Sequence, residues 1–321
     1  MGRYLLRRLG FAAVLVVVVS SAALLLTRLA PGDFADLQGL DLTAEQRAQI
    51  RENLGLDRSF AAQYVSWLGG VVQFDFGRSL LYSRPVSVLV KERALNTAVL
   101  ATTALLFATL IGLPLGIYSG TRRGAGRTIV KAISTLGISV PPLIGSLALV
   151  FLAARTGWLP VGGMTSSAGI DMSWAQWLGD LARHLPVPAL ALAIPLAATL
   201  EKLQSEAIEA ASRERFVIAS RARGVDRARA ILRHAWPVSL KPVLGLYGLM
   251  IGSLFSGSFV VEVVTSWPGL GRLMLDALRA RDLFLVAGCA ATGALFLAAG
   301  TLLADLLLAY ADPRVGSGER S

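Results

Sequence analysis

The sequence is poor in the residues that build disulfides, metal clusters and water-soluble surfaces. Of its 321 residues only one is cysteine and two are histidine, which excludes a disulfide framework and a cysteine-rich metal site. Charged residues make up only 16% of the chain and hydrophobic residues 54%, whereas a typical soluble domain carries about 25% charge. A water-soluble fold could not hide so much apolar surface, and a disordered chain would be polar. The composition therefore predicts an integral membrane protein.

The sequence also lacks the common signatures of catalysis. It contains no Gly-x-x-x-x-Gly-Lys-Ser/Thr phosphate loop and no His-Glu-x-x-His, and no Gly-x-Ser-x-Gly elbow. Cys289 lies inside a hydrophobic run, where we expect a small packing residue rather than a nucleophile. We therefore expect a non-catalytic chain with no bound cofactor and no metal. The net charge of +10 can indicate a nucleic-acid partner, but in a membrane protein it more often reflects cationic cytoplasmic loops.

The hydrophobic runs predict six membrane-spanning helices, because one span needs about 20 mostly apolar residues. These runs cover residues 9–29, 94–118, 129–154, 185–200, 243–264 and 283–310. The first run follows basic residues and has no small-residue cleavage site after it, which favours an uncleaved signal anchor. Pro141, Pro142 and Pro195 fall inside the third and fourth runs and predict kinks, whose freed carbonyls need a polar neighbour or a water-lined cavity.

Basic residues set the orientation that we expect, because cytoplasmic loops are enriched in lysine and arginine. Nine of the 31 basic residues lie in 201–242, so this loop and both ends of the chain are predicted to be cytoplasmic. The chain then divides into four parts, and the core contains a second, smaller external loop at 155–184. The four parts are an anchor helix at 1–30, an extracytoplasmic segment at 31–93, a core at 94–310 and a tail at 311–321.

Two features of the runs concern packing and charge. Glycines at every fourth position predict a face on which a second helix approaches closely; they are Gly112, Gly116, Gly120 and Gly124, the last of them expected in the loop beyond. Glu262 and Asp305 lie within the fifth and sixth runs, near their ends. An acid in a membrane span implies a functional or pairing role, although snorkelling or a nearby arginine is the simpler interpretation for these two.

The loop at 201–242 contains a helix-forming segment that ends at Gly224, a residue that suits a helix C-terminal cap. Phe216, Ala219 and Ala222 share one face of this segment, with Ile218 on its flank. Arg221 and Arg223 project elsewhere. Such a helix offers an apolar ridge ringed by positive charge to the groove of a soluble partner, or it lies on anionic lipid. Composition alone does not separate these two interpretations.

Residues 216–225 (FVIASRARGV) resemble the cytoplasmic coupling segment of binding-protein-dependent ABC importer permeases. Further strings resemble the dipeptide, oligopeptide and nickel permeases of that family, in family order over nearly the whole chain. They are PGD at 31–33, LGLD at 54–57, DFG at 75–77, SWPGLGR at 266–272, RD at 281–282 and DPR at 312–314. One departure is Ile218, where many relatives carry a glutamate; the resemblance therefore gives no polar role to this position.

The resemblance implies an all-α fold of six transmembrane helices, the type I ABC importer permease. It implies that 214–226 form a coupling helix in a cleft of a cytoplasmic ATPase subunit. The contact residues would be Glu214, Phe216, Ile218, Ala219, Arg221, Ala222, Arg223 and Gly224. Residues 266–272 would cap the external mouth, with a turn at Pro268 and Gly269. The named residues of that cap are Trp267, Pro268, Gly269, Gly271 and Arg272.

The function implied is that of a permease subunit in the bacterial inner membrane, driving peptide import by alternating access. The implied partners are a second permease subunit, two ATP-binding subunits that hold ATP and Mg²⁺, and an extracytoplasmic substrate-binding protein. A nickel or metal-chelate importer shares the same motifs and stays open as an alternative. A stand-alone secondary transporter would need paired half-repeats and polar residues near the midplane, and no convincing inverted repeat is present. The missing catalytic motifs argue against a membrane-bound enzyme.

Overall fold

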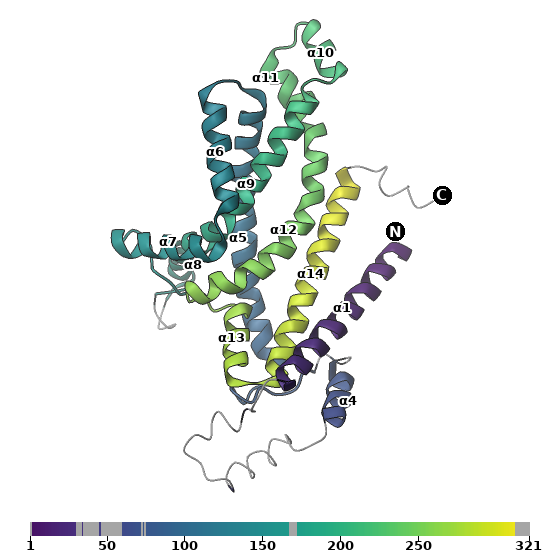
Figure 1. Cartoon of the computed structure of the whole chain (residues 1–321), viewed down its shortest axis with the longest axis vertical. Helices are drawn as coiled ribbons and strands as arrows, with labels where there is room; N and C mark the ends of the chain where they lie inside the picture. Colours follow the sequence, from purple (N-terminus) through teal and green to yellow (C-terminus); the bar gives the residue numbers. More distant parts are fainter. Residues whose placement is uncertain are drawn as a thin grey trace. The chain divides into compact units, whose positions relative to one another are not determined.

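The computed structural model describes residues 2–29, 34, 45, 60–71, 73, 75–166 and 172–311, and these are helical almost throughout. Within this part of the chain the extended structure is limited to one bridge between Arg78 and Pro85, so the expected all-α class is confirmed. Figure 1 shows the helices: α1 Gly2–Leu29, α4 Phe60–Val71, α5 Val86–Thr121, α6 Ala125–Ser139, α7 Pro142–Thr156, α8 Trp174–His184, α9 Pro186–Ala211, α10 Arg215–Ala222, α11 Arg227–Ala230, α12 Trp236–Val264, α13 Leu270–Ala280 and α14 Leu283–Ala311.

Five helical stretches are long and apolar enough to cross a membrane, and a bent pair makes up to six. The five are Leu6–Leu29, Val86–Thr121, Pro186–Ala211, Arg227–Val264 and Leu283–Leu303. The bent pair is α6 and α7, which meet at 105° where one helix with a kink was predicted. Val140 takes an extended conformation before Pro141, as residues before proline do, and Pro142 opens the new helix at a position that needs no N–H donor.

The described chain forms two compact units. The first comprises Met1–Ala98 and Pro268–Ala298, and the second comprises Val99–Trp267 and Ala299–Ser321. The division at residues 30, 93 and 310, which follows from the expected membrane topology, stays a prediction. The strings at 31–33, 54–57 and 312–314 lie outside the described residues, as do most of the predicted external segment before Phe60 and the tail after Ala311.

In the first unit, the buried carboxylate of Asp282 joins the segment before α5 to the start of α14. Its Oδ2 accepts hydrogen bonds from the Ser79 hydroxyl at 2.6 Å and from the Leu81 amide at 3.0 Å. Its Oδ1 accepts from the Leu285 amide at 3.1 Å, which caps the first turn of α14. Asp282 is fully buried. The strings at 75–77 and 281–282 thus lie on either side of one hydrogen-bonded junction.

In the second unit, α9 packs against α5, and the predicted glycine face is the reason it can do so. A Cβ placed on Gly112 would lie 2.5 Å from the Ala197 carbonyl oxygen, and one on Gly116 would lie 2.6 Å from the Gln204 Cβ. Gly120 meets α9 in the same way at Ile208 and Ser205. Gly124 lies beyond the end of α5 with open space around it. The helix-packing interpretation of this glycine series is therefore confirmed.

The predicted loop at 201–242 is shorter than hydropathy indicated, because helices extend into it from both sides. α9 continues to Ala211 instead of ending at Leu200, and α12 begins at Trp236 instead of Val243. Charged residues end a hydrophobic run without ending a helix, since glutamate and lysine are good helix formers. The connection that remains holds α10, α11 and a π-helical turn, Ile231–Ala235.

Candidate functional site

The helix α10 stands at one end of the second unit, beyond the end of α9 (Figure 1). The chain leaves α9 at Ser212, whose hydroxyl donates to the Ile208 carbonyl at 2.6 Å. Glu214 then takes an extended conformation at the N-cap position, and its carbonyl accepts from the amides of Val217 and Ile218. The predicted helix at 214–226 is therefore an eight-residue helix with a defined start, followed by a separate turn.

Val217 and Ser220 attach α10 to the rest of the unit. Both are buried, at 2% and 1% exposure, and Val217 packs in a small apolar cluster with members from α9, α11 and the π-helical turn. That cluster consists of Ile208, Ala211, Val217, Ala230 and Ala235. The sequence analysis does not single out Val217, because it considers only the face that the helix offers to a partner. The signal was available, since a short helix must also bury one face against its own chain.

The opposite face of α10 carries the residues predicted for docking. Phe216 is 44% exposed and Ile218 is 56% exposed, and Ala219 and Ala222 are also exposed. Large apolar side chains that stand out on a short helix beyond the membrane spans form a surface that a protein or lipid would cover. The structure thus places the predicted apolar ridge outward. The docking of a partner on this ridge stays a prediction.

Gly224 ends α10 in the conformation that its prediction as a cap requires. Its φ is +87°, in the left-handed region that glycine adopts at little cost. Its amide donates to the Arg221 carbonyl at 2.9 Å, and the next amide, of Val225, donates to the Ser220 carbonyl at 3.3 Å. A Cβ on Gly224 would meet nothing within 4 Å. The glycine therefore serves the backbone turn and not a close contact within this chain.

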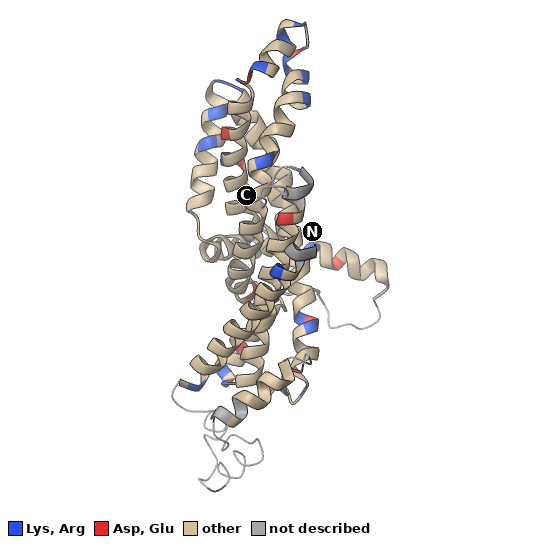
Figure 2. Cartoon of the chain, turned by 90° about the vertical axis from the view of Figure 1, so that its right-hand side faces the viewer, with Lys and Arg blue, Asp and Glu red and all other residues tan. Residues whose placement is uncertain are grey.

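Basic residues surround α10 on the same end of the unit, as Figure 2 shows. The exposed ones in the connection are Arg213, Arg215, Arg221, Arg223, Arg227, Arg229 and Arg233. Two contacts fix this end to neighbouring helices. Arg227 donates to the Thr121 carbonyl at the end of α5 at 2.7 Å, and Arg127 of α6 pairs with Glu209 of α9 at 2.8 Å. These contacts hold α11 on the end of α5 and α6 on α9.

The string predicted for the external mouth divides between the two units. Trp267 is fully buried in the apolar core of the second unit. In the first unit, the Pro268 carbonyl accepts from the Asn96 side chain at 2.8 Å, and Gly269 opens α13, whose Leu270 amide donates to the Thr97 hydroxyl at 2.9 Å. Gly271 is buried and Arg272 is exposed. These residues hold the start of α13 on α5, and a role at the mouth stays a prediction.

The structure also locates the acids within the spans. Glu262 is fully buried, close to the α12 C-cap at Thr265, so it does not snorkel to the surface of the chain. Asp305 is half-buried in α14. Glu201 was missed, because it follows the predicted end of its span. It is 1% exposed and accepts a hydrogen bond from the Ser119 hydroxyl of α5. Among the residues that the structure describes, no group that could hold a metal ion is found.

In the connection between α7 and α9, Asp180 of α8 orders the segment before it. Its carboxylate accepts from the Ser166 hydroxyl at 2.5 Å and from the Ser166 amide at 2.6 Å. These two hydrogen bonds lower the pKa of the Asp180 carboxyl from its ordinary value, because both stabilise the charged form. No sequence pattern singles out this aspartate, since its partner lies on a loop whose path is set by the fold.

Taken together, these features define a helical protein of several membrane spans with one short helix held outward beyond them. Comparison with known families then identifies the group. Residues 1–100 match the N-terminal membrane component of binding-protein-dependent transport systems, and residues 112–317 match the inner membrane component of the same systems. The chain belongs to this family of ABC importer permeases.

Individual relatives cover nearly the whole chain. The oligopeptide transport system permease protein AppB of Bacillus subtilis is 30% identical over 98% of this chain and 99% of its own. A putative peptide permease protein of Brucella ovis is 32% identical over 98% of each chain. Among solved structures, the MetNI methionine ABC transporter in an inward-facing conformation matches with a TM-score of 0.50. It is 18% identical and covers 72% of this chain and 97% of that one, which supports the fold alone.

Proposed function

We propose that this chain is one membrane subunit of an ATP-driven importer of peptides, and that α10 is its contact with an ATPase subunit. The observation that carries the proposal is the exposure of Phe216 and Ile218 on a helix that Val217 holds rigidly to its own chain. An apolar helix face on a fixed support suits the helix-in-groove mode of recognition. The exposed arginines around it suit an acidic rim on that groove.

Peptides are the substrate class that the relatives support. The curated relatives described above are named for oligopeptide or peptide transport, and their similarity runs the full length of the chain. This favours peptides over the nickel or metal-chelate alternative. No name among these relatives concerns a secondary carrier, and the family is defined by dependence on a separate binding protein.

The proposed mechanism is a shift between inward-open and outward-open states, biased by ATP in the partner subunits. A displacement of α10 would pass to α9 through the buried cluster around Val217 and to α5 through the Arg227 contact with Thr121. The close packing of Gly112 and Gly116 on α9 makes α5 and α9 move as one body. In this mechanism the chain binds no nucleotide, and ATP and Mg²⁺ stay with the partner.

The assembly that this mechanism needs has five parts. We propose a second permease subunit beside this one, two ATP-binding subunits beneath them and a substrate-binding protein outside. In this arrangement both ends of the chain lie in the cytoplasm, which puts α10 and its arginines on the side where ATP is available. The basic end of the second unit supports that orientation, because cationic segments stay inside.

The proposal is tested by replacing both exposed apolar residues of α10 with glutamate, Phe216→Glu with Ile218→Glu. Both side chains are exposed and lie outside the buried cluster around Val217, so the variant should still reach the membrane. The yield of ATPase subunits recovered with it should fall by about 30-fold, the loss expected for an interface hot spot of about 2 kcal/mol. Peptide uptake by vesicles containing the full transporter should fall in parallel.

A control is Leu178→Glu, which places one such charge on the half-exposed apolar surface of α8. This variant should recover ATPase subunits normally. Gly224→Arg provides a second check, because a side chain at φ +87° strains the turn without touching the cluster around Val217. This variant should reach the membrane, and the transporter that contains it should hydrolyse ATP in its partner subunits without taking up peptide. Full recovery of ATPase subunits with the double glutamate variant, or purification of an active wild-type carrier without them, would contradict the proposal.

A further inference from the structure

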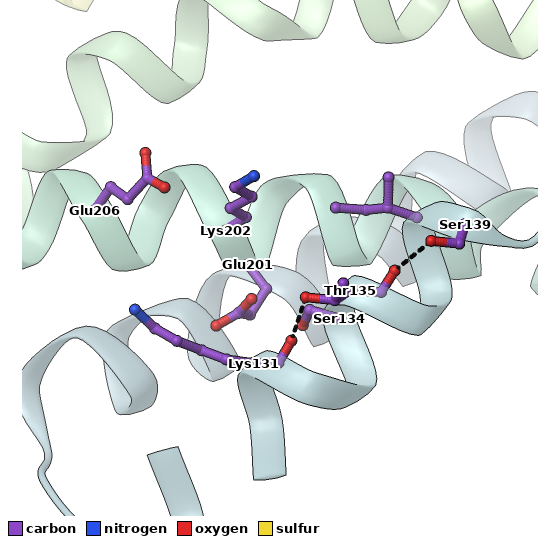
Figure 3. A pocket seen from close by; sticks show the side chains of 8 residues that line it. Lys131, Ser134, Thr135, Ser139, Glu201, Lys202 and Glu206 are labelled. Atoms are coloured by element: carbon purple, nitrogen blue, oxygen red, sulfur yellow. Dashed lines mark hydrogen bonds between the residues drawn. The ribbon is translucent and has the colours of Figure 1, made fainter. Parts of the chain in front are cut away.

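A polar cavity lies between α6 and α9 in the second unit, apart from α10. Its volume is about 220 Å³. Its charged and hydroxyl lining is Lys131, Ser134, Thr135 and Ser139 from α6 with Glu201, Lys202 and Glu206 from α9. Figure 3 shows Glu201 reaching from α9 towards α6, while Lys202 and Glu206 stand one turn apart along α9.

The charges in this cavity are not neutralised by one another. Glu201 is held by the Ser119 hydroxyl, but Lys131, Lys202 and Glu206 use their charged groups in no hydrogen bond or ion pair among the described residues. The helices that carry them are candidate membrane spans. Unpaired charges on a span avoid hydrocarbon and face a water-filled space or a bundle interior. This side of α6 and α9 therefore faces water or a polar ligand.

The other side of α6 has the opposite character. Ile129, Ile133 and Leu136 are 57%, 61% and 68% exposed and recur at the spacing of one helix face. Apolar side chains of this kind suit lipid or an apolar subunit contact. Because α6 presents one apolar face and one charged face, it marks the boundary between the side of the unit that faces lipid and the side that faces water.

We propose that this cavity is part of the transport path and binds a free terminus of the peptide in transit. The inference rests on the proposed function. Lysine ammoniums match a terminal carboxylate, Glu201 and Glu206 match a terminal ammonium, and the hydroxyls of Thr135 and Ser139 match backbone amides. The volume is about 220 Å³, whereas a site that encloses a whole small ligand has a volume of about 300–1,000 Å³. The cavity accordingly takes one end of a peptide and not its whole length.

The first test measures whether water and a thiol reagent reach the cavity, and which ligands protect it from that reagent. Cys289 is the single cysteine of this chain, so Cys289→Ser gives a permease chain without thiols, into which Thr135→Cys or Leu136→Cys is introduced and whose labelling is read on this chain alone. These neighbours lie on the charged and the apolar face of α6. In the nucleotide-free full transporter, in open membrane fragments, an anionic methanethiosulfonate reagent should label position 135 about ten-fold faster, because the thiolate forms only in water.

A tripeptide library with free termini should slow the labelling of position 135, and the same library with acetylated and amidated termini should not. Equal rates of labelling at positions 135 and 136 would contradict the proposal that the cavity is part of a water-filled transport path. Equal protection by free and blocked peptides would overturn recognition of a terminus. Protection that depends on phosphatidylethanolamine in the membrane, with no effect of peptide, would assign the cavity to a lipid headgroup and also overturn the proposal.

The second test measures transport. The double variant Lys131→Gln with Glu206→Gln should take up the free-terminus library about ten-fold more slowly or worse, since charge-assisted hydrogen bonds are lost. It should still recover its ATPase subunits. Lys91→Gln, an exposed lysine of α5 in the other unit, is the control and should transport normally. Normal uptake by the double variant would reject this site alone, whereas absence of peptide uptake by the unsubstituted transporter would reject the proposed function.

Discussion

Buried acids are the residues for which structure adds most to the sequence. Glu262 and Asp305 stand out in the sequence because they interrupt hydrophobic runs. Glu201 and Asp282 do not, since the first follows the end of a run and the second precedes one, yet both are almost completely buried. Burial of a polar residue depends on which helix packs over it, and no local pattern records that. The helical spacing of Ala197, Glu201, Gln204 and Ile208 was one sign in the sequence that α9 continues.

The hydrogen bonds of Asp282 lead to a prediction for Asp282→Asn. An amide has the shape of the carboxylate but turns one NH2 group towards the donors of Ser79, Leu81 or Leu285. The variant should lose about 2 kcal/mol of stability, the scale of hydrogen bonds to a charged group. The midpoint of thermal unfolding of the purified transporter, followed by intrinsic fluorescence, measures this loss.

Glu92→Gln is the comparison for that experiment. Glu92 pairs with Arg84 at 2.9 Å, but both side chains are at least half exposed, and an exposed ion pair contributes about 0–1 kcal/mol. Its unfolding midpoint should hardly change. If both variants unfolded at the wild-type temperature, Asp282 would not stabilise the junction between the first turn of α14 and the segment before α5.

At the scale of helices, the contact between α5 and α9 depends on glycine. A side chain on Gly116 would begin 2.6 Å from Gln204 and 2.8 Å from the Glu201 carbonyl oxygen, and the backbone cannot yield there without separating the helices. Gly245 of α12 has nothing within 4 Å of the corresponding position. The two glycines therefore differ in packing although both lie inside membrane spans.

We predict that Gly116→Leu strongly reduces the amount of folded protein in the membrane, because overpacking of this kind costs about 1–3 kcal/mol or more. Gly245→Leu should leave it near the wild-type amount. Quantification of detergent-extracted protein that elutes as a single species gives the comparison. A normal yield of folded Gly116→Leu protein would show that α5 and α9 do not pack as described.

The helices also show where hydropathy and turn chemistry are sufficient and where they are not. The positions of the long apolar helices and of the break at Pro141 follow from the sequence, because these depend on local apolar content and on the geometry before proline. The 105° angle between α6 and α7 does not, since a proline permits many angles and the packing of α7 on α9 and α12 selects one. For α10 the sequence predicts the outward apolar face, but it does not single out Val217, whose burial against other helices depends on the fold.

At the scale of the whole chain, the remaining question is which side of the membrane each loop occupies. The basic residues near α10 and α11 and the family of the chain together support cytoplasmic ends and an external loop between α7 and α8. The charge count predicts an orientation, but the partners proposed to complete the path are other chains. For this reason the sequence indicates a transporter more clearly than it indicates the lining of its path.

We predict the orientation directly for fusions of an alkaline phosphatase reporter, which is active only outside the cytoplasm. Inserted after Gly163 it should be active, and fused after the last residue it should be inactive. A β-galactosidase fusion at the same two places should give the opposite pattern. Activity of the phosphatase at the C-terminal fusion would place that end outside and would remove α10 from reach of any ATPase.

The π-helical turn Ile231–Ala235 has a consequence for how the chain tolerates changes of length. A π-turn is an α-helix with one additional residue accommodated as a bulge. Deleting one residue there yields an ordinary helical turn, and α12 keeps its rotational setting. The same deletion within α12 turns every later side chain by about 100° around the axis and takes Met250 and Leu254 out of the core. Natural length variation between these two helices is therefore expected to concentrate in this five-residue turn.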